Sequence, residues 1–467
     1  MGGGAITREL HPGFHCPALT HDVLLWSGIA REMALERYGL QRLTPVTELF
    51  APDADGTAIT LRADAPAYGE FRRALGQGAD VVGELLASPP PDIDAPGARD
   101  LWNLLAAGRA FRSLGRRDSY RLLRWLPMPA ADFIGEWFDD GPLAAGLVAR
   151  GLSGTLLGPR SGGSTLVLLL HEAHRRLAGG TWRARGGPGA LTAAMAAAAT
   201  KAGAEIRTGT TVERILVRDE RVAGVIVDGE EIVASTVVSA IDPKTTFLDL
   251  VDPADLMPDF AMKMRNYRAA GTVAKVNVAL SALPRFTGAV SPADLSGRIH
   301  IGPRLDTLER AFDHAKYGEI SMTPWLDVQI PSILDPSLAP ADAHVMSIYV
   351  HYAPFTLRGT TWRDQAPVLL DRVIDTLDQY APGLRSLIVA TEIITPERLQ
   401  QAHGLWGGHI FHGELAPDQL FAMRPLLGHG RYATPVAGLY LCGAGTHPGG
   451  FLSGASGKLA ASRLTNV

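Results

Sequence analysis

The sequence is short of cysteine, of long apolar runs and of any excess of charge of one sign. Its two cysteines, Cys16 and Cys442, are too few for a disulfide framework or a four-cysteine zinc site. The most apolar run, Leu166–Leu170, is far too short to span a bilayer, and the first residues lack the pattern of a signal peptide. We therefore expect a protein of the cytoplasm, or of an organelle matrix if the source is eukaryotic, without an integral membrane segment.

No polybasic stretch stands out in the chain, whose formal net charge is −4. Proteins that bind nucleic acid or an anionic membrane surface through charge usually carry a clustered excess of Lys and Arg. The sequence therefore suggests neither kind of partner, and it gives no indication of the oligomeric state.

The chain of 467 residues is too long for one hydrophobic core, so two or three interleaved domains are expected. A helix is expected at Trp26–Tyr38, ended by Gly39, and helical patterns dominate from about 46 to 180. Residues 246–410 alternate strand-like runs, such as Val273–Leu280, with helical patterns, such as Trp362–Tyr380. This alternation predicts a sheet with helices on one face.

The middle of the chain combines a glycine loop with strand patterns. The loop at 185–189 precedes an alanine-rich helix, Ala190–Lys201, and a strand is expected just after Glu205. The alternating residues that follow Val212 predict a meander of antiparallel strands, and the run Thr236–Ala240 predicts a buried strand. The loop resembles a dinucleotide-binding turn, but its spacing is G-G-x-G and not G-x-G-x-x-G. An ordinary helix start, where glycine is needed for close packing, is an equally good interpretation.

The strongest single motif lies near the C-terminus, where a strand, Gly438–Cys442, runs into a glycine-rich loop and a helix near Ser453. Free N–H groups at a helix start carry partial positive charge, so an anion or an electron-rich ring edge would be stabilised there. An ordinary glycine-rich turn is the alternative. The loop is not a P-loop because residue 452 is Leu, and it is an improbable first Rossmann turn because Pro448 replaces the third glycine.

Two hydrolytic chemistries are disfavoured. His171 and His174 are three residues apart, whereas a zinc protease helix needs histidines four residues apart, so we expect a surface helix and no metal. The serine-hydrolase elbow G-x-S-x-G is incomplete, because Lys458 stands where its last glycine belongs.

Taken together, four segments in the correct order resemble the phytoene-desaturase-like flavoproteins, which are FAD-dependent oxidoreductases of the amine-oxidase superfamily. The resemblance covers essentially the whole chain. The segments are Gly2-Gly3-x-Ala5-x-Thr7 with His11-Pro12-Gly13-Phe14, Arg185–Leu191 with Gly203–Ile206, Val212–Pro243, and Gly443–Gly450.

The resemblance implies an α/β fold, with a doubly wound FAD/NAD(P)-binding domain and an inserted α+β substrate domain. The FAD-binding domain would comprise residues 1–45, 181–245 and 411–467, and the substrate or cap domain residues 46–180 and 246–410. The implied activity is removal of hydride from a C–H bond of an apolar small-molecule substrate by FAD. No catalytic residue is implied. The cofactor-binding positions it implies are Gly2, Gly3, Gly186, Gly187, Val212, Gly443, Ala444, Gly445, Thr446, Gly450 and Phe451.

The family normally has a strand, a G-x-G-x-x-G turn, a helix and a second strand before the position of Gly2. We therefore expect an FAD domain that is truncated at its N-terminus, and we favour a start codon assigned too late as the reason. The alternative hypothesis is a non-catalytic binding or regulatory protein that retains the flavoprotein fold without tightly bound FAD.

Overall fold

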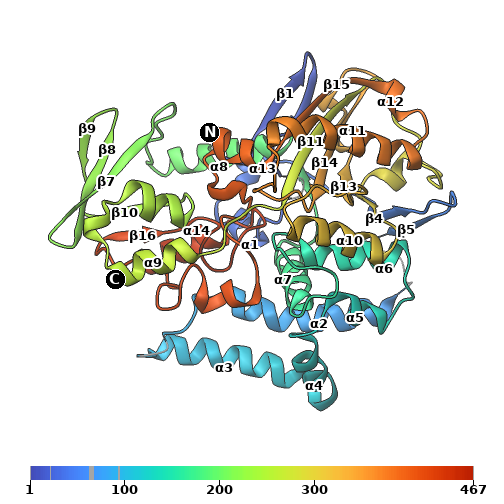
Figure 1. Ribbon diagram of the computed structural model, residues 1–467. Coiled ribbons are helices and arrows are strands. Elements are labelled where there is room, and N and C mark those ends of the chain that lie inside the picture. The colour runs from blue at the N-terminus through green and yellow to red at the C-terminus, as the bar shows by residue number, and fades with distance from the viewer. Residues whose placement is uncertain (1, 21–22, 63–67, 93–94, 466–467) are drawn as a thin grey trace.

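The computed structural model describes residues 2–20, 23–62, 68–92 and 95–465 and has an α/β architecture (Figure 1). Its largest sheet has seven strands in the order β15-β11-β14-β13-β12-β4-β5. Neighbouring strands are antiparallel except β12 and β4, which are parallel. The strands are β4 Thr47–Pro52, β5 Ala58–Arg62, β11 Val273–Leu280, β12 Arg298–Ile301, β13 Leu326–Gln329, β14 His344–His351 and β15 Ile388–Ile394.

The large sheet is buried on both faces around its central strands. All eight residues of β11 are buried. One face packs against α11 (Trp362–Tyr380), through contacts such as those of Val276 and Val373, and the other meets the hairpin of β1 (Thr7–His11) and β2 (Phe14–Pro17). The expected strand Val273–Leu280 and helix Trp362–Tyr380 are thus confirmed.

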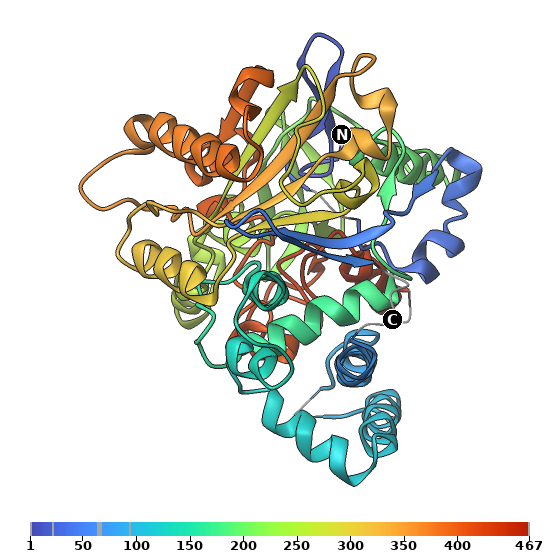
Figure 2. The same cartoon turned by 90° about the vertical axis from the view of Figure 1, so that its right-hand side faces the viewer.

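A helical layer lies below the sheet in Figures 1 and 2 and contributes a large share of the largest apolar core. Its helices are α2 Gly69–Leu86, α3 Ala98–Ser113, α4 Gly115–Trp125, α5 Ala130–Gly135, α6 Pro142–Ala149 and α7 Ser164–Leu177. Of these, α6 and α7 are buried along most of their length, because they lie between the sheet and α2. The expectation of helices from 46 to 180 missed the β4–β5 hairpin, whose strands join the sheet beside β12 (Figure 2).

Two smaller sheets lie at the opposite side of the molecule (Figure 1). The short strands β10 (Val237–Ser239) and β16 (Leu439–Leu441) are parallel neighbours. The expected meander is confirmed as β7 Val212–Arg218, β8 Arg221–Val227 and β9 Glu230–Val233. The remaining elements are α1 Ser27–Glu32, β3 Arg42–Leu43, β6 Arg183–Ala184, α8 Pro188–Lys201, α9 Pro258–Asn266, α10 Leu305–Lys316, α12 Leu384–Leu387, α13 Pro396–His403 and α14 Ala455–Leu464.

Three local expectations were wrong. The strand expected after Glu205 is absent and residues 202–211 are exposed, because no described strand lies beside this segment to accept its hydrogen bonds. For the same reason β10 is not fully buried, and Val238 is 41% exposed. The helix Trp26–Tyr38 is broken at Ala34, whose φ of 50° is left-handed, although Gly39 ends the segment as expected.

No helix within the described ranges is both long enough and apolar enough to cross a membrane.

Candidate cofactor and substrate site

The N-terminal glycines lie against the start of α8. Thr7 joins the two segments, since its hydroxyl donates to the Gly186 carbonyl at 2.8 Å and accepts from the Gly189 N–H at 3.1 Å. A Cβ on Gly187 would lie 2.3 Å from Thr7 Oγ1, and one on Gly2 would lie 2.8 Å from Thr192 Oγ1. Close contact between the two segments therefore requires glycine at these positions.

The Gly186 N–H, at the start of α8, already has an anionic partner. It donates to the Asp335 carboxylate at 2.6 Å. Gly3, in contrast, is exposed and has open space where a Cβ would stand. A cofactor phosphate at this end would have to meet Gly2 and Gly3, because the Asp335 carboxylate holds the Gly186 donor.

The C-terminal loop begins where β10 and β16 end side by side. Ser239 pairs with Leu441, and the Cys442 N–H then donates to the Ser239 carbonyl at 2.8 Å. In open α/β sheets ligands bind at the carboxyl ends of parallel strands, which is the position of Gly443 and Thr446 here. The Thr446 hydroxyl and N–H both donate to the Gly443 carbonyl and close a tight turn.

The glycines of this loop are required by close packing against the chain itself. A Cβ on Gly443 would lie 2.3 Å from the Ala240 carbonyl oxygen, and one on Gly445 would lie 2.4 Å from Pro243 Cδ. A Cβ on Gly450 would lie 2.1 Å from Phe411 Cδ1. Contacts within the chain therefore determine the conformation of the loop without a ligand.

Arg424 holds the C-terminal loop from behind and is fully buried. Its guanidinium donates to five carbonyls, including Ala444 at 2.8 Å; the others are Phe411, Gly413, Glu414 and Gln419. Among the described residues no carboxylate forms an ion pair with it. Burial lowers its pKa from the ordinary value, yet an arginine stays protonated, so a fixed positive charge lies behind Gly443–Phe451.

Phe451 joins the loop to α7. Its ring lies 5.1 Å from the His171 ring, 5.0 Å from His174 and 4.9 Å from Phe411. The Trp26 indole N–H donates to His174 Nδ1 at 3.2 Å, so His174 carries its proton on Nε2. That Nε2 faces the Pro448 carbonyl, to which it donates a hydrogen bond outside normal geometry.

The surface position expected for His171 and His174 was wrong. His174 is fully buried, and burial followed by the neighbouring His447 lowers the pKa of His174 to about 3. The apolar run Leu166–Leu170 on the same helix could have indicated this, because a helix that is apolar all round is buried. No group of three or more His, Cys, Asp or Glu within the described ranges is arranged to hold a metal ion.

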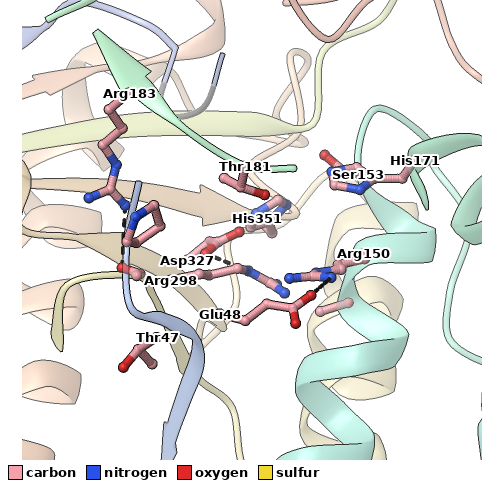
Figure 3. A pocket seen from close by; sticks show the side chains of 13 residues that line it. Thr47, Glu48, Arg150, Ser153, His171, Thr181, Arg183, Arg298, Asp327 and His351 are labelled. Carbon is pink, nitrogen blue, oxygen red and sulfur yellow. Dashed lines mark hydrogen bonds and ion pairs between the residues drawn. The ribbon is translucent and has the colours of Figure 1, made fainter. Parts of the chain in front are cut away.

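A cavity of about 60 Å³, called the polar cavity below, opens beside His171 between the large sheet and the helical layer (Figure 3). Charged and imidazole side chains from separate elements converge on it. They are Glu48, Arg150, His171, Arg183, Arg298, Asp327 and His351.

Ion pairs organise the walls of the polar cavity. Arg298, on β12, donates to Asp327 at 2.7 Å and to the Gly146 carbonyl at 2.9 Å. Arg150 donates to Glu48 at 3.1 Å (Figure 3), and Arg72 donates to the other oxygen of the same carboxylate at 3.2 Å. Burial by itself raises the pKa of Glu48, but the guanidiniums of Arg150, Arg175 and Arg72 outweigh it and the net shift is downward.

Both histidines of the polar cavity are neutral. Burial, followed by the charges of Arg150 and Arg298, lowers the pKa of His171 well below its ordinary value. Burial and Arg298 do the same to His351, whose ring stacks on Trp325 with centroids 3.6 Å apart. His171 Nδ1 and His351 Nε2 are buried and have no hydrogen-bond partner among the described residues.

A second cavity, of about 250 Å³, shares Glu48 and Arg150 with the first. This cavity, called the apolar cavity below for its hydrocarbon lining, is also lined by Tyr68 and by charged side chains, which are Glu48, Arg72, Arg150, Glu172, Arg175 and Arg176. Its apolar lining consists of Leu61, Phe71, Leu75, Phe138, Leu143 and Leu147.

The structure thus joins the predicted site residues into two groups. Gly2, Gly3, Gly186 and Gly187 form one, and Gly443–Thr446 with Gly450 and Phe451 form the other. The Trp26 N–H, which donates to the Ser453 carbonyl at 3.1 Å, ties the second group to the N-terminal segment. Val212 begins β7 and pairs with Val227 in the meander.

Comparison with known proteins gives consistent findings. The family model described as flavin containing amine oxidoreductase matches residues 138–465. The rat protein named pyridine nucleotide-disulfide oxidoreductase domain-containing protein 2 is 35% identical over 99% of this chain and 87% of its own length. A lycopene-forming phytoene desaturase of Pseudescherichia vulneris is 30% identical over 64% of this chain and 59% of its own.

The solved structure of an oxidoreductase from Methanosarcina mazei superposes with a TM-score of 0.60 at 14% identity. It covers 100% of this chain and 92% of its own, and at this identity the likeness concerns the fold.

Proposed function

The chain belongs to the flavin-containing amine oxidoreductases and is an oxidoreductase, and we propose that it uses FAD to remove hydride from a C–H bond of an apolar small-molecule substrate. The substrate class is suggested by the relatives named as phytoene desaturases and as a limonene dehydrogenase subunit. The proposed domains are those of the resemblance: residues 1–45, 181–245 and 411–467 for FAD, and 46–180 and 246–410 for the substrate.

The observation that carries the proposal is the C-terminal loop at the ends of β10 and β16. It combines a ligand-binding position of the α/β fold with the fixed positive charge of the buried Arg424. These groups fit the polar edge of a flavin ring, which has carbonyl and nitrogen acceptors. When bound, the flavin accepts a hydride, and the protein supplies its position and electrostatic field.

The proposed contacts divide between the two groups of residues. Gly443, Ala444, Gly445, Thr446, Gly450 and Phe451 would hold the flavin end; Gly2 and Gly3 would meet the phosphates and ribose, Gly186 and Gly187 would form the turn behind them, and Val212 would meet the adenine. Arg424 fixes the loop and favours negative charge near it.

The polar cavity is proposed to hold substrate, because His171 on its wall contacts Phe451. His351, another lining residue, is held by stacking on the fully buried Trp325. Hydride removal from a C–H bond needs no fixed acid–base pair, and we name none.

The test is the visible spectrum of the protein purified in its full natural reading frame, with released flavin identified by chromatography. We expect flavin absorbance bands at close to one flavin per chain. Replacing Arg424 by Gln should weaken retention of the flavin, whereas replacing the exposed Arg160 by Gln should not. A folded protein without flavin would refute the proposal and favour a binding or regulatory protein that keeps the fold.

A further inference from the structure

We propose that the polar cavity binds the anionic group, a carboxylate or a phosphate, of an amphiphilic molecule whose apolar part lies in the apolar cavity. The proposal rests on the proposed function only in identifying this molecule with the substrate. Binding itself depends on side chains of this chain alone.

The first argument is the convergence of guanidiniums from opposite walls. Arg150 follows α6 in the helical layer, and Arg298 lies on β12 of the sheet, with their side chains 12% and 8% exposed. A guanidinium has five N–H donors, and the described bonds use one from Arg150 and two from Arg298. An oxyanion in the cavity would accept from donors of both.

The second argument is the sharing of Glu48 between two arginines. Each of its oxygens accepts from a different guanidinium, Arg150 or Arg72. One negative charge is thus divided between two positive charges beside a small cavity. An anionic ligand beside Arg150 would give that guanidinium an acceptor of its own in addition to the shared carboxylate.

The third argument is the pair of buried imidazole nitrogens without partners, His171 Nδ1 and His351 Nε2. Both rings line the polar cavity and, being neutral, each can present either a donor or an acceptor according to its tautomer. Buried polar atoms of this kind normally have a hydrogen-bond partner. A carboxylate or phosphate between them would supply acceptors for both.

The position proposed for the apolar part of the ligand follows from the residues that line both cavities. Glu48 and Arg150 line both cavities, so a molecule held by Arg150 can extend from one into the other. The second cavity is walled by six leucine and phenylalanine side chains, which favour burial of a hydrocarbon chain. A small hydrophilic anion would leave that wall uncovered.

The proposal can be tested by calorimetric titration of the full chain at constant ionic strength. Four probes separate the contributions: decanoate, decyl phosphate, decanol and inorganic phosphate. We expect decanoate and decyl phosphate to bind saturably and decanol, which lacks the charge, to bind at least about tenfold more weakly. Inorganic phosphate, which lacks the chain, should also bind at least about tenfold more weakly than decyl phosphate.

Thr181 provides a matched pair of variants, because it lines the polar cavity and is only half-buried. Thr181→Asp adds a negative charge and should weaken decanoate binding at least about tenfold more than Thr181→Asn, which has the same size without the charge. Arg150→Gln should act like Thr181→Asp, with the exposed Arg160→Gln as its control. Thermal melting establishes that each variant is folded.

Three outcomes would overturn the proposal: decanol binding as tightly as decanoate, decanoate binding that Thr181→Asp does not weaken, or binding of inorganic phosphate alone. A protein that binds decanoate but retains no flavin would refute the proposed function and support the anion site. A protein that retains flavin but binds neither decanoate nor decyl phosphate would do the reverse.

Discussion

Lowering the pH from 7 to 5 should strongly destabilise the folded protein, because several histidines are buried where they cannot take up a proton. Burial is the first cause in every case, and these side chains are at most 3% exposed. It lowers the pKa to about 3 for His174, His300 and His409 and to about 4 for His447.

The sign follows from comparing the two states. Between these lowered pKa values and about 6.5, the unfolded chain takes up protons that the folded chain does not, so the free energy of unfolding rises with pH. The contribution is complete above about pH 6.5 and is lost as the pH falls towards 4. At pH 5 each histidine costs about 2 kcal/mol relative to pH 7, and the four together about 8 kcal/mol. A typical domain has about 5–15 kcal/mol in total.

The assay is thermal and urea unfolding at pH 7, 6 and 5, followed by circular dichroism. The His409→Asn variant should show a pH dependence smaller by about one proton, because the amide oxygen can replace Nδ1 as acceptor of the Phe411 N–H, now 3.2 Å away. The exposed His11→Asn should behave like the parent. Equal melting temperatures at pH 7 and 5, or an unchanged pH dependence in His409→Asn, would refute the reasoning.

Gly450→Ala should lower the free energy of unfolding by about 1–3 kcal/mol, because the added Cβ would lie 2.1 Å from Phe411. Gly457→Ala, with open space at that point of α14, should be neutral or stabilising. Equal urea midpoints for the two variants would contradict the packing. Arg424→Met should lower the free energy of unfolding by at least about 3 kcal/mol in the same assay, because five carbonyls lose their donor. A decrease no greater than that of Arg160→Met would count against the role of Arg424 in fixing the C-terminal loop. Val233→Lys, at a 77% exposed position of β9, should change the free energy of unfolding by less than about 0.5 kcal/mol and raise the solubility in precipitation assays. A large destabilisation would instead show that this side chain is covered in solution.

Local patterns were sufficient for much of the fold. Val273–Leu280 and Trp362–Tyr380 formed where their apolar periodicity indicated, because each buries its apolar residues within one long element. The meander was legible from its alternation and its turns. The strand expected after Glu205 failed, because a strand depends on a neighbour that local sequence does not specify.

Only part of the candidate site could be predicted from the sequence. The C-terminal loop is continuous in sequence, so its strand, glycines and helix could be read directly. The polar cavity could not, since Glu48, Arg150, His171, Arg298 and His351 come from five separate elements and have no common spacing. Only the sheet topology, with β4 inserted beside β12, brings Glu48 and Arg298 to one side of the molecule.

The bonds of Arg424 have a consequence for how the molecule moves. Residues 411–424 and 443–453 contain no α-helix or strand, only two short 3-10 turns and irregular loops, and loops are ordinarily more mobile than the elements they connect. Here one guanidinium fastens carbonyls from both stretches, so neither can open unless that buried cation is released as well. Amide hydrogens such as those of Cys442 and Thr446 should therefore exchange with solvent as slowly as those of β11, so that the most irregular part of the chain would be among its most rigid.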